Sequence, residues 1–272
     1  MRFRLSGKED IAVRGGSAHH ARRRRDRVLH LRPTFMSTVV AAARPPGRDG
    51  LERELKYVIP AGRALLARYM VAALCRPDAQ YPSAVVSTIY YDTPDLELLS
   101  EKINSDYLKT KVRLRWYSSS PGPAHAFLEI KSRVGALRRK LRIETSLTAD
   151  EVRELPLEHP ALVQVLEAAR PLGAALPARL MPALLLRYER FRFLEPVSES
   201  RICVDAGIEA VRGNPRLLGH VFQARLPLAV IEVKGRDDEL PLALRSLVRL
   251  GARRASCSKY GLAGAALLRY TP

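Results

Sequence analysis

Charged and apolar residues alternate with a period of two along several segments of the chain. The clearest is residues 108–117, LKTKVRLRWY, where cations occupy every second position: Lys109, Lys111, Arg113 and Arg115. Successive side chains of a strand point to opposite faces, so this segment predicts a strand with one cationic and one apolar face. Neighbouring like charges repel, and the cationic row must therefore face either water or an anion.

The same reasoning along the chain predicts eight strands separated by short amphipathic helices. The strands are expected at 51–59, 84–92, 107–117, 125–133, 137–145, 182–194, 199–206 and 226–234. Helices are expected at 63–76, 96–102, 160–169, 240–250 and 258–268, and another begins at the capping-box spacing of Thr148 and Glu151. Because strands and helices do not alternate regularly, the sheet is predicted to be mostly antiparallel.

Two arrangements can explain charged faces on nearly every strand. In the first, a one-sided sheet exposes its polar face to water. In the second, which the repetition favours, the strands close into an eight-stranded barrel of an α+β fold. Its charged lumen is then a tunnel, and helices cover its apolar outer faces. Buried charges must be paired, so such a lumen requires phosphate oxygens, interspersed glutamates and a divalent metal.

Composition adds a strong basic bias that is concentrated near the N-terminus. The formal net charge is +18, and residues 1–50 hold twelve Lys/Arg and four Asp/Glu, a net +8. We therefore expect residues 1–50 to be a basic disordered tail, or a stretch upstream of the true start at Met36, and residues 51–272 to form the domain.

Cysteine use and hydropathy suggest a cytoplasmic protein. The three cysteines, Cys75, Cys203 and Cys257, have no CxxC spacing and are expected to be free thiols in a reducing compartment. The sequence has no apolar run of about 18 residues, so no transmembrane segment is expected. Nucleic acid is a poor partner, because the cations lie on strands without aromatic stacking platforms.

Several short motifs together resemble one known family. They are Glu52-x-Glu54-x-Lys56-Tyr57, YYDTPDLELL (90–99), KVRLRWY (111–117), FLEIKSR (127–133), YERFRF (188–193), RICVD (201–205), VIEVK (230–234) and SKY (258–260). In this order they resemble the VTC domain of bacterial proteins, the polyphosphate polymerase branch of the CYTH-like triphosphate tunnel metalloenzymes. The resemblance covers about residues 51–268.

The resemblance implies roles for individual residues. Phosphate-binding positions would be Lys56, Lys111, Arg113, Arg115, Lys131, Lys140, Arg190, Arg201 and Lys259. Glu232 would hold Mn²⁺ or Mg²⁺ with Glu54 as a second ligand, and Lys259, Lys234 and Glu232 would be the catalytic groups. Guanidinium forks and lysine point charges are suited to phosphate, and carboxylates with phosphate oxygens are suited to these metals.

Three functions remain open at the sequence level. The first is a metal-dependent polymerase that transfers the γ-phosphoryl group of ATP to a growing polyphosphate chain. The second is a CYTH-like triphosphatase, which Glu52 favours because bacterial VTC sequences commonly have Arg at that position. The third is a non-catalytic module that binds polyphosphate or inositol phosphates. A membrane protein is a possible partner in each case.

Overall fold

The computed structural model describes residues 53–103, 108–118, 124–134, 137–218 and 224–268. These residues all belong to one compact unit, Ser37–Pro272. The expectations for residues 1–50 and for Glu52 lie outside the described residues. No helix in the described ranges is long and apolar enough to cross a membrane.

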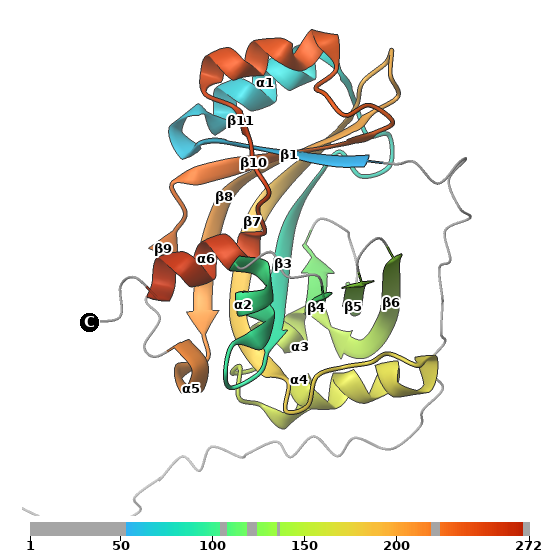
Figure 1. Ribbon diagram of the computed structural model, residues 1–272, viewed down its shortest axis with the longest axis vertical. Helices are drawn as coiled ribbons and strands as arrows, with labels where there is room; N and C mark the ends of the chain where they lie inside the picture. The colour runs from blue at the N-terminus through green and yellow to red at the C-terminus, as the bar shows by residue number, and fades with distance from the viewer. Residues whose placement is uncertain (1–52, 104–107, 119–123, 135–136, 219–223, 269–272) are drawn as a thin grey trace, which may run out of the picture. The chain divides into compact units, whose positions relative to one another are not determined.

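One curved sheet organises the described chain (Figure 1). Its strand order is β11-β1-β10-β8-β7-β3-β4-β5-β6, and β2 and β9 pair at the sides with β7 and β8. Every ladder is antiparallel, as the sequence predicts. The strands are β1 Arg53–Pro60, β2 Arg76–Pro77, β3 Ser83–Asp92, β4 Leu108–Tyr117, β5 His125–Val134, β6 Leu137–Thr148, β7 Met181–Leu194, β8 Arg201–Gly213, β9 Ala224–Arg225, β10 Leu228–Gly235 and β11 Arg253–Arg254.

The prediction of a closed, eight-stranded barrel is wrong in two respects. The sheet has eleven strands, because β2, β9 and β11 have two residues each and are too short to show any periodicity. Hydrogen bonds do not close the sheet within the described residues, where β11 and β6 are its edges. β11 pairs with the outer side of β1, while Arg139 on β6 donates to the carbonyls of Leu172 and Gly173. The edge formed by β11 is thus only two residues long.

Helices pack on both faces of the sheet. They are η1 Ala61–Arg63, α1 Ala64–Leu74, α2 Glu97–Ile103, α3 Ala149–Glu154, α4 Pro160–Gln164, η2 Val165–Leu172, α5 Pro215–Leu218, η3 Leu242–Leu250 and α6 Lys259–Leu268. The predicted capping box is present, since Thr148 and Glu151 exchange side chain to backbone bonds. The predicted helix 160–169 divides into α4 and a 3-10 segment, η2, that contains Pro171.

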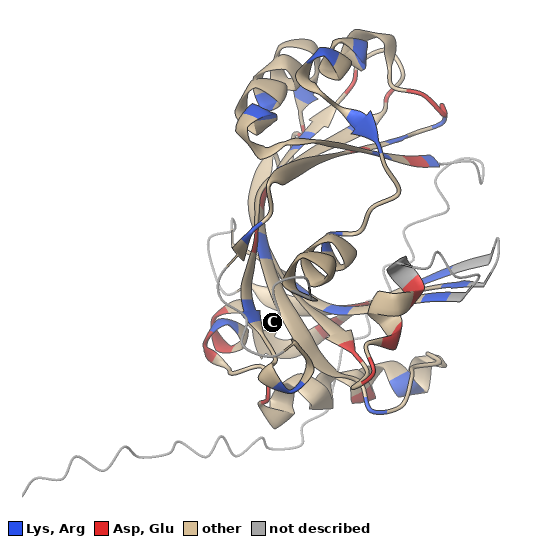
Figure 2. Cartoon of the chain, turned by 60° about the vertical axis from the view of Figure 1, so that its left-hand side comes forward, with Lys and Arg blue, Asp and Glu red and all other residues tan. Residues whose placement is uncertain are grey.

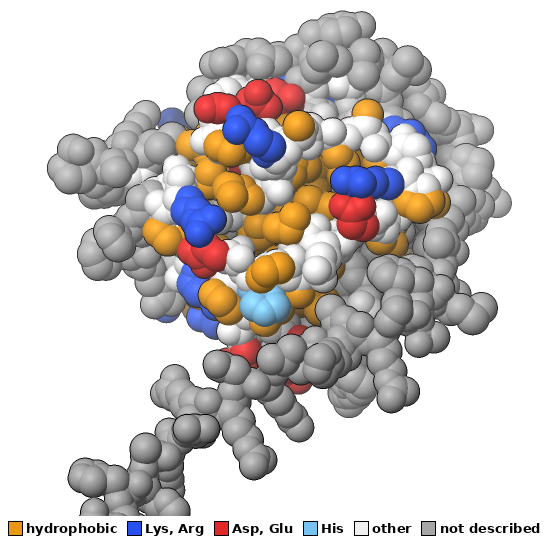
Figure 3. Space-filling model, turned by 90° about the horizontal axis from the view of Figure 1, so that it is seen from below, with side chains coloured by type: hydrophobic (Ala, Val, Ile, Leu, Met, Phe, Trp, Pro, Cys, Tyr) orange, Lys and Arg blue, Asp and Glu red, His pale blue; other side chains and the backbone are white. Residues whose placement is uncertain are grey.

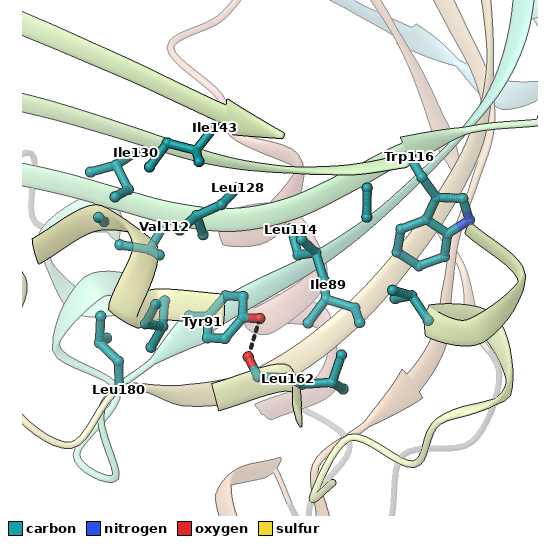
Figure 4. Close-up of a cluster of buried hydrophobic side chains, with 14 of the residues drawn as sticks. Ile89, Tyr91, Val112, Leu114, Trp116, Leu128, Ile130, Ile143, Leu162 and Leu180 are labelled. Carbon is teal, nitrogen blue, oxygen red and sulfur yellow. Dashed lines mark hydrogen bonds between the residues drawn. The ribbon is translucent and has the colours of Figure 1, made fainter. Parts of the chain in front are cut away.

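Three apolar clusters fill the space between the sheet and these helices. The first packs β3, β4 and β5 against α3, α4 and η2, and its buried Tyr91 hydroxyl donates to the Leu162 carbonyl at 2.6 Å (Figure 4). The second lies between β1, β8 and β10 and the pair α1 and η3. The third lies on the opposite face of the sheet from the first two and packs α6 against β7 and β8. Val112, Leu114 and Trp116 on β4 belong to the first cluster, so the apolar face predicted for this strand is the buried one.

The lower face of the unit exposes apolar side chains among separate charged groups (Figure 3). The charged residues of α3 and η2 form short-range pairs, Arg153 with Asp150 and Arg170 with Glu167. Each of these two arginines is therefore paired within its own helix.

Candidate functional site

A cavity of about 190 Å³ lies on the concave side of the sheet. Strands from both ends of the strand order line it, β1 and β10 near one end and β4, β5 and β6 at the other, together with the start of α6. Three glutamates, Glu54, Glu129 and Glu232, contribute to its walls. Its ten cationic side chains are Lys56, Lys111, Arg113, Arg115, Lys131, Lys140, Arg142, Arg190, Lys234 and Lys259. The strands that carry many of these residues curve through the molecule in Figure 2.

The structure brings together all but one of the residues for which the sequence predicts a phosphate-binding, metal-binding or catalytic role. Arg201 is the exception, because it is not among the cavity-lining residues. It lies at the first position of β8, opposite Lys234 on β10 and Leu194 on β7. Lys109, at the other end of the cationic row of β4, is also absent from the lining.

Lys259 lies at the centre of an ion-pair cluster. It is the first residue of α6, whose start is capped by the Ser258 hydroxyl, which accepts from the Gly261 amide at 2.9 Å. Its ammonium lies 2.5 Å from Asp205 and 3.2 Å from Glu232. Burial alone would lower the pKa of Lys259, but these two carboxylates raise it above its usual value. Lys259 is therefore a fixed positive charge.

Arg190 on β7 shares the same two carboxylates. Its guanidinium binds Asp205 through two bonds of 2.6 Å and reaches Glu232 at 3.1 Å. Asp205 is completely buried. Burial would raise the pKa of Glu232, but Lys259 and Arg190 hold it well below its usual value. Asp205 orients the two cations from behind, because such paired bonds fix the geometry as well as the charge.

Glu129 on β5 orients the arginines of β4, as Asp205 orients Lys259 and Arg190. It lies opposite Arg113 in the ladder, accepts from its Nε at 2.7 Å, and has Arg115 and Arg142 within 3.9 Å. Burial opposes ionisation of Glu129, but Arg113 and Arg115 lower its pKa below the usual range. One carboxylate thus holds three guanidinium groups in a fixed arrangement beside the cavity.

Tyr188 connects the two sides of this arrangement. Its buried hydroxyl accepts from Arg115 at 3.1 Å, and its ring lies 4.8 Å from the Lys259 ammonium and 5.6 Å from the Arg190 guanidinium. A ring face attracts cations at these distances. Tyr188 therefore separates the cations of β4 from those of β7 and α6 without adding a charge.

Lys131 on β5 has a pKa that its surroundings lower. Burial, followed by the nearby charges of Arg113 and Lys234, lowers its pKa to about 8, and Glu54 and Glu129 oppose this only in part. Its ladder neighbours are Lys111 and Lys140. A bound anion would relieve this repulsion.

A family model decides the identity of the chain. The model, described as the VTC domain, matches residues 51–268. The chain belongs to the VTC domain family. No curated protein matches it.

Three solved structures are similar to this VTC domain at low sequence identity. A protein from Pyrococcus horikoshii is 16% identical, with a TM-score of 0.42 over 77% of this chain and 97% of that one. A candidate adenylyl cyclase from Hippeastrum, described as revealing a dominant triphosphatase activity, is 15% identical, with a TM-score of 0.44 over 79% and 96%. A candidate adenylate cyclase from Bacillus halodurans is 14% identical, with a TM-score of 0.41 over 82% and 97%. Similarity at this level does not bear on activity.

The carboxylates of the VTC domain fit a divalent metal only if a ligand completes its coordination. No group of three His, Cys, Asp or Glu suited to a metal occurs in the described part of the chain. Glu232 and Glu54 both line the cavity, and Glu54 lies 3.1 Å from Lys56 and 3.7 Å from Lys234. Mg²⁺ is commonly held by one or two carboxylates together with substrate phosphates and water. The carboxylates of Glu232 and Glu54 therefore fit a metal ion whose remaining ligands are phosphate oxygens and water.

Sequence reasoning missed the groups that hold the cations in place. Asp205 and Arg142 share faces with predicted site residues, Arg201 and Lys140, and strand alternation could have identified both. The partners of Asp205 depend on the register between β7 and β8, which places Arg190 opposite it. Tyr188 is uncharged, so the alternation of charged residues along the strands could not identify it.

Proposed function

We propose that this VTC domain is a metal-dependent polyphosphate polymerase that transfers the γ-phosphoryl group of ATP to the end of a polyphosphate chain. The observation that carries the proposal is the cavity with ten cations and three carboxylates. Such an excess of positive charge around one cavity, with Arg115 and Lys259 buried, is unfavourable without anions, and a chain of phosphates supplies them at regular spacing. The family membership supports the same ligand class.

The side chains divide into two groups around the cavity. Arg113, Arg115 and Lys131 approach from β4 and β5, and Lys56, Arg190 and Lys259 from β1, β7 and α6. We assign both groups to phosphate binding, with Lys140 and Lys111 extending the first and Lys234 the second. Because Asp205 and Glu129 fix the guanidinium groups beforehand, little ordering is needed on binding.

The reaction is an in-line transfer between two phosphate groups. A terminal oxygen of the polyphosphate chain forms a bond to the γ-phosphorus of ATP, and the bond to the β–γ bridging oxygen breaks. ADP leaves with that electron pair, and the chain is one phosphate longer. Positioning and charge neutralisation supply most of the rate of such transfers. Lys259 is suited to this because its pKa keeps it protonated beside the reacting phosphate. A metal bound by Glu232 and Glu54 would neutralise further charge on the phosphate oxygens.

The experiment is to supply ATP and Mn²⁺ to the purified chain and analyse the phosphate products. The proposal predicts a ladder of long polyphosphates on a gel and one ADP for each phosphate added. Lys259→Gln should lower the rate about a hundredfold or more. Arg170→Gln, at an exposed position outside the cavity, should leave it unchanged.

Two results would contradict the polymerase assignment. Release of orthophosphate with no ladder would establish a triphosphatase, in which water takes the place of the chain end. Binding of tripolyphosphate without turnover of ATP would establish a binding module.

A further inference from the structure

The outer faces of α1 and η3 expose an unusual number of large apolar side chains. Of the ten exposed large hydrophobic residues in the described chain, six belong to these two helices: Leu65, Leu66, Tyr69, Leu74, Leu242 and Val248. Leu242 is 79% exposed, and Leu65 and Val248 are 58% exposed. We call this surface the α1–η3 face.

The two helices lie together over the second apolar cluster (Figure 1). Their inner residues, Ala67 and Val71 on α1 and Leu244 and Leu247 on η3, are buried there. α1, with the sequence ALLARYMVAAL, has one charged residue and is apolar around its whole circumference. Helices of this kind are normally covered on all sides. The α1–η3 face therefore has the composition of a surface that another body covers.

The charged residues within the two segments of the α1–η3 face all have one sign. Segments 61–76 and 240–254 contain no Asp or Glu. They hold seven arginines: Arg63, Arg68, Arg76, Arg245, Arg249, Arg253 and Arg254. Figure 2 shows cationic residues along both helices. At the border, the Glu239 carboxylate lies 2.7 Å from Arg245, and the backbone carbonyl of Asp238 accepts from Arg254.

The positive charge of the α1–η3 face determines what kind of partner can bind there. A second copy placed face to face would bring two cationic surfaces together, and residues 1–50 carry a net +8, so both would be repelled. An anionic occupant is attracted. Leucine, valine and tyrosine interspersed with arginine are typical of helices that lie in the headgroup region of a membrane, with the guanidinium groups at lipid phosphates.

We propose that the α1–η3 face docks on a membrane surface rich in anionic lipid. Leu65, Tyr69, Leu242 and Val248 enter the headgroup region, and the arginines beside them contact lipid phosphate. Docking does not depend on the reaction in the cavity, because no residue of α1 or η3 lines it.

A tryptophan placed on the α1–η3 face tests this in the full chain. The one native tryptophan, Trp116, is 1% exposed and gives a constant background. Tyr69→Trp is mixed with vesicles of phosphatidylcholine, alone or with 30–50% phosphatidylglycerol (roughly physiological surface charge), that carry brominated acyl chains. Val163→Trp on α4, 40% exposed in the native chain and close to locally paired charges, is the matched control.

We expect quenching and a blue shift at position 69 with the anionic vesicles, and neither at position 163. Adding Leu65→Gln and Leu242→Gln should weaken vesicle binding about tenfold or more, because each removes an apolar group that would be buried in lipid. Binding without quenching at position 69 would assign the contact to the basic N-terminus and overturn the proposal. So would shielding of position 69 by self-association in the absence of vesicles, or quenching that is equal at both positions.

Discussion

At the scale of single residues, the cavity depends on buried carboxylates that lie behind the cations. Asp205 contacts Lys259 and Arg190, and Glu129 contacts Arg113. Removing one member of a buried ion pair costs about 3–5 kcal/mol, because the other charge is left without compensation. These carboxylates therefore stabilise the folded site, while the remaining hydrogen-bonding capacity of the cations can serve phosphate.

Lys131 gives a pH dependence that can be measured. Its pKa of about 8 means that the ammonium loses its proton as pH rises from 7 to 9, whereas a lysine with a normal pKa stays charged. Tripolyphosphate affinity should fall about three- to tenfold over this interval as one phosphate contact is lost. Isothermal titration calorimetry at constant ionic strength measures the tripolyphosphate affinity at each pH.

The variant Lys131→Met isolates this contribution from the titration of the ligand itself. It should bind more weakly than the native chain at pH 7 and show a flatter pH dependence. Lys109→Met, on the same cationic row but outside the cavity lining, should retain the native slope. Identical slopes for the native chain and Lys131→Met would show that Lys131 does not contact the ligand.

At the scale of elements, α6 is held by a bond that the sequence motifs do not explain. The Tyr260 hydroxyl donates to the buried Asp92 carboxylate at 2.6 Å, and its ring stacks on Tyr90 with centroids 4.9 Å apart. Asp92 also accepts from the amides of Leu98 and Leu99 at the start of α2. Since Tyr260 follows Lys259, this bond fixes the end of α6 that presents the cavity lysine.

Tyr260→Phe tests this positioning. Loss of the bond to buried Asp92 should lower the free energy of unfolding by about 1–3 kcal/mol. The turnover number for ATP should fall more than KM changes, because Lys259 loses its alignment. Thermal unfolding and steady-state kinetics, measured well below the melting temperature, give both quantities.

Tyr91→Phe is the matched control for Tyr260→Phe. Its hydroxyl also makes a buried bond of 2.6 Å, to the Leu162 carbonyl in the first apolar cluster, and Tyr91 does not line the cavity. It should lose similar stability and keep the native turnover number. Equal losses of turnover in both variants would mean that the Asp92 bond acts on global stability alone.

At the scale of the whole molecule, the sequence predicts the strands and the direction of their side chains correctly, but it does not predict whether the sheet closes into a barrel. The eight strands with clear alternation are all present, and the cavity lining includes Lys56, Arg113 and Lys131 as predicted. Alternation requires several residues, so two-residue strands such as β11 leave no signal. Whether a sheet closes depends on accumulated twist and on what covers its edges, which the sequence pattern does not specify.

Residue partners across the sheet are equally hard to predict. The resemblance of the RICVD motif predicts that Arg201 binds phosphate, but Arg201 lies at the end of β8 and is not among the cavity-lining residues. Asp205 pairs with Arg190 because a register shift in β7 and β8 precedes them. Such shifts change which residues face each other, and only the folded ladder shows them.

The central claim is that the cationic cavity is the place where the phosphate chain binds. A crystal structure of the chain with tripolyphosphate and Mn²⁺ tests this most directly. We expect phosphate density between Arg113 on β4 and Lys259 on α6, and an anomalous manganese peak beside Glu232 that is absent in Glu232→Gln. Phosphate bound only outside the cavity, with the lining residues unchanged, would contradict it.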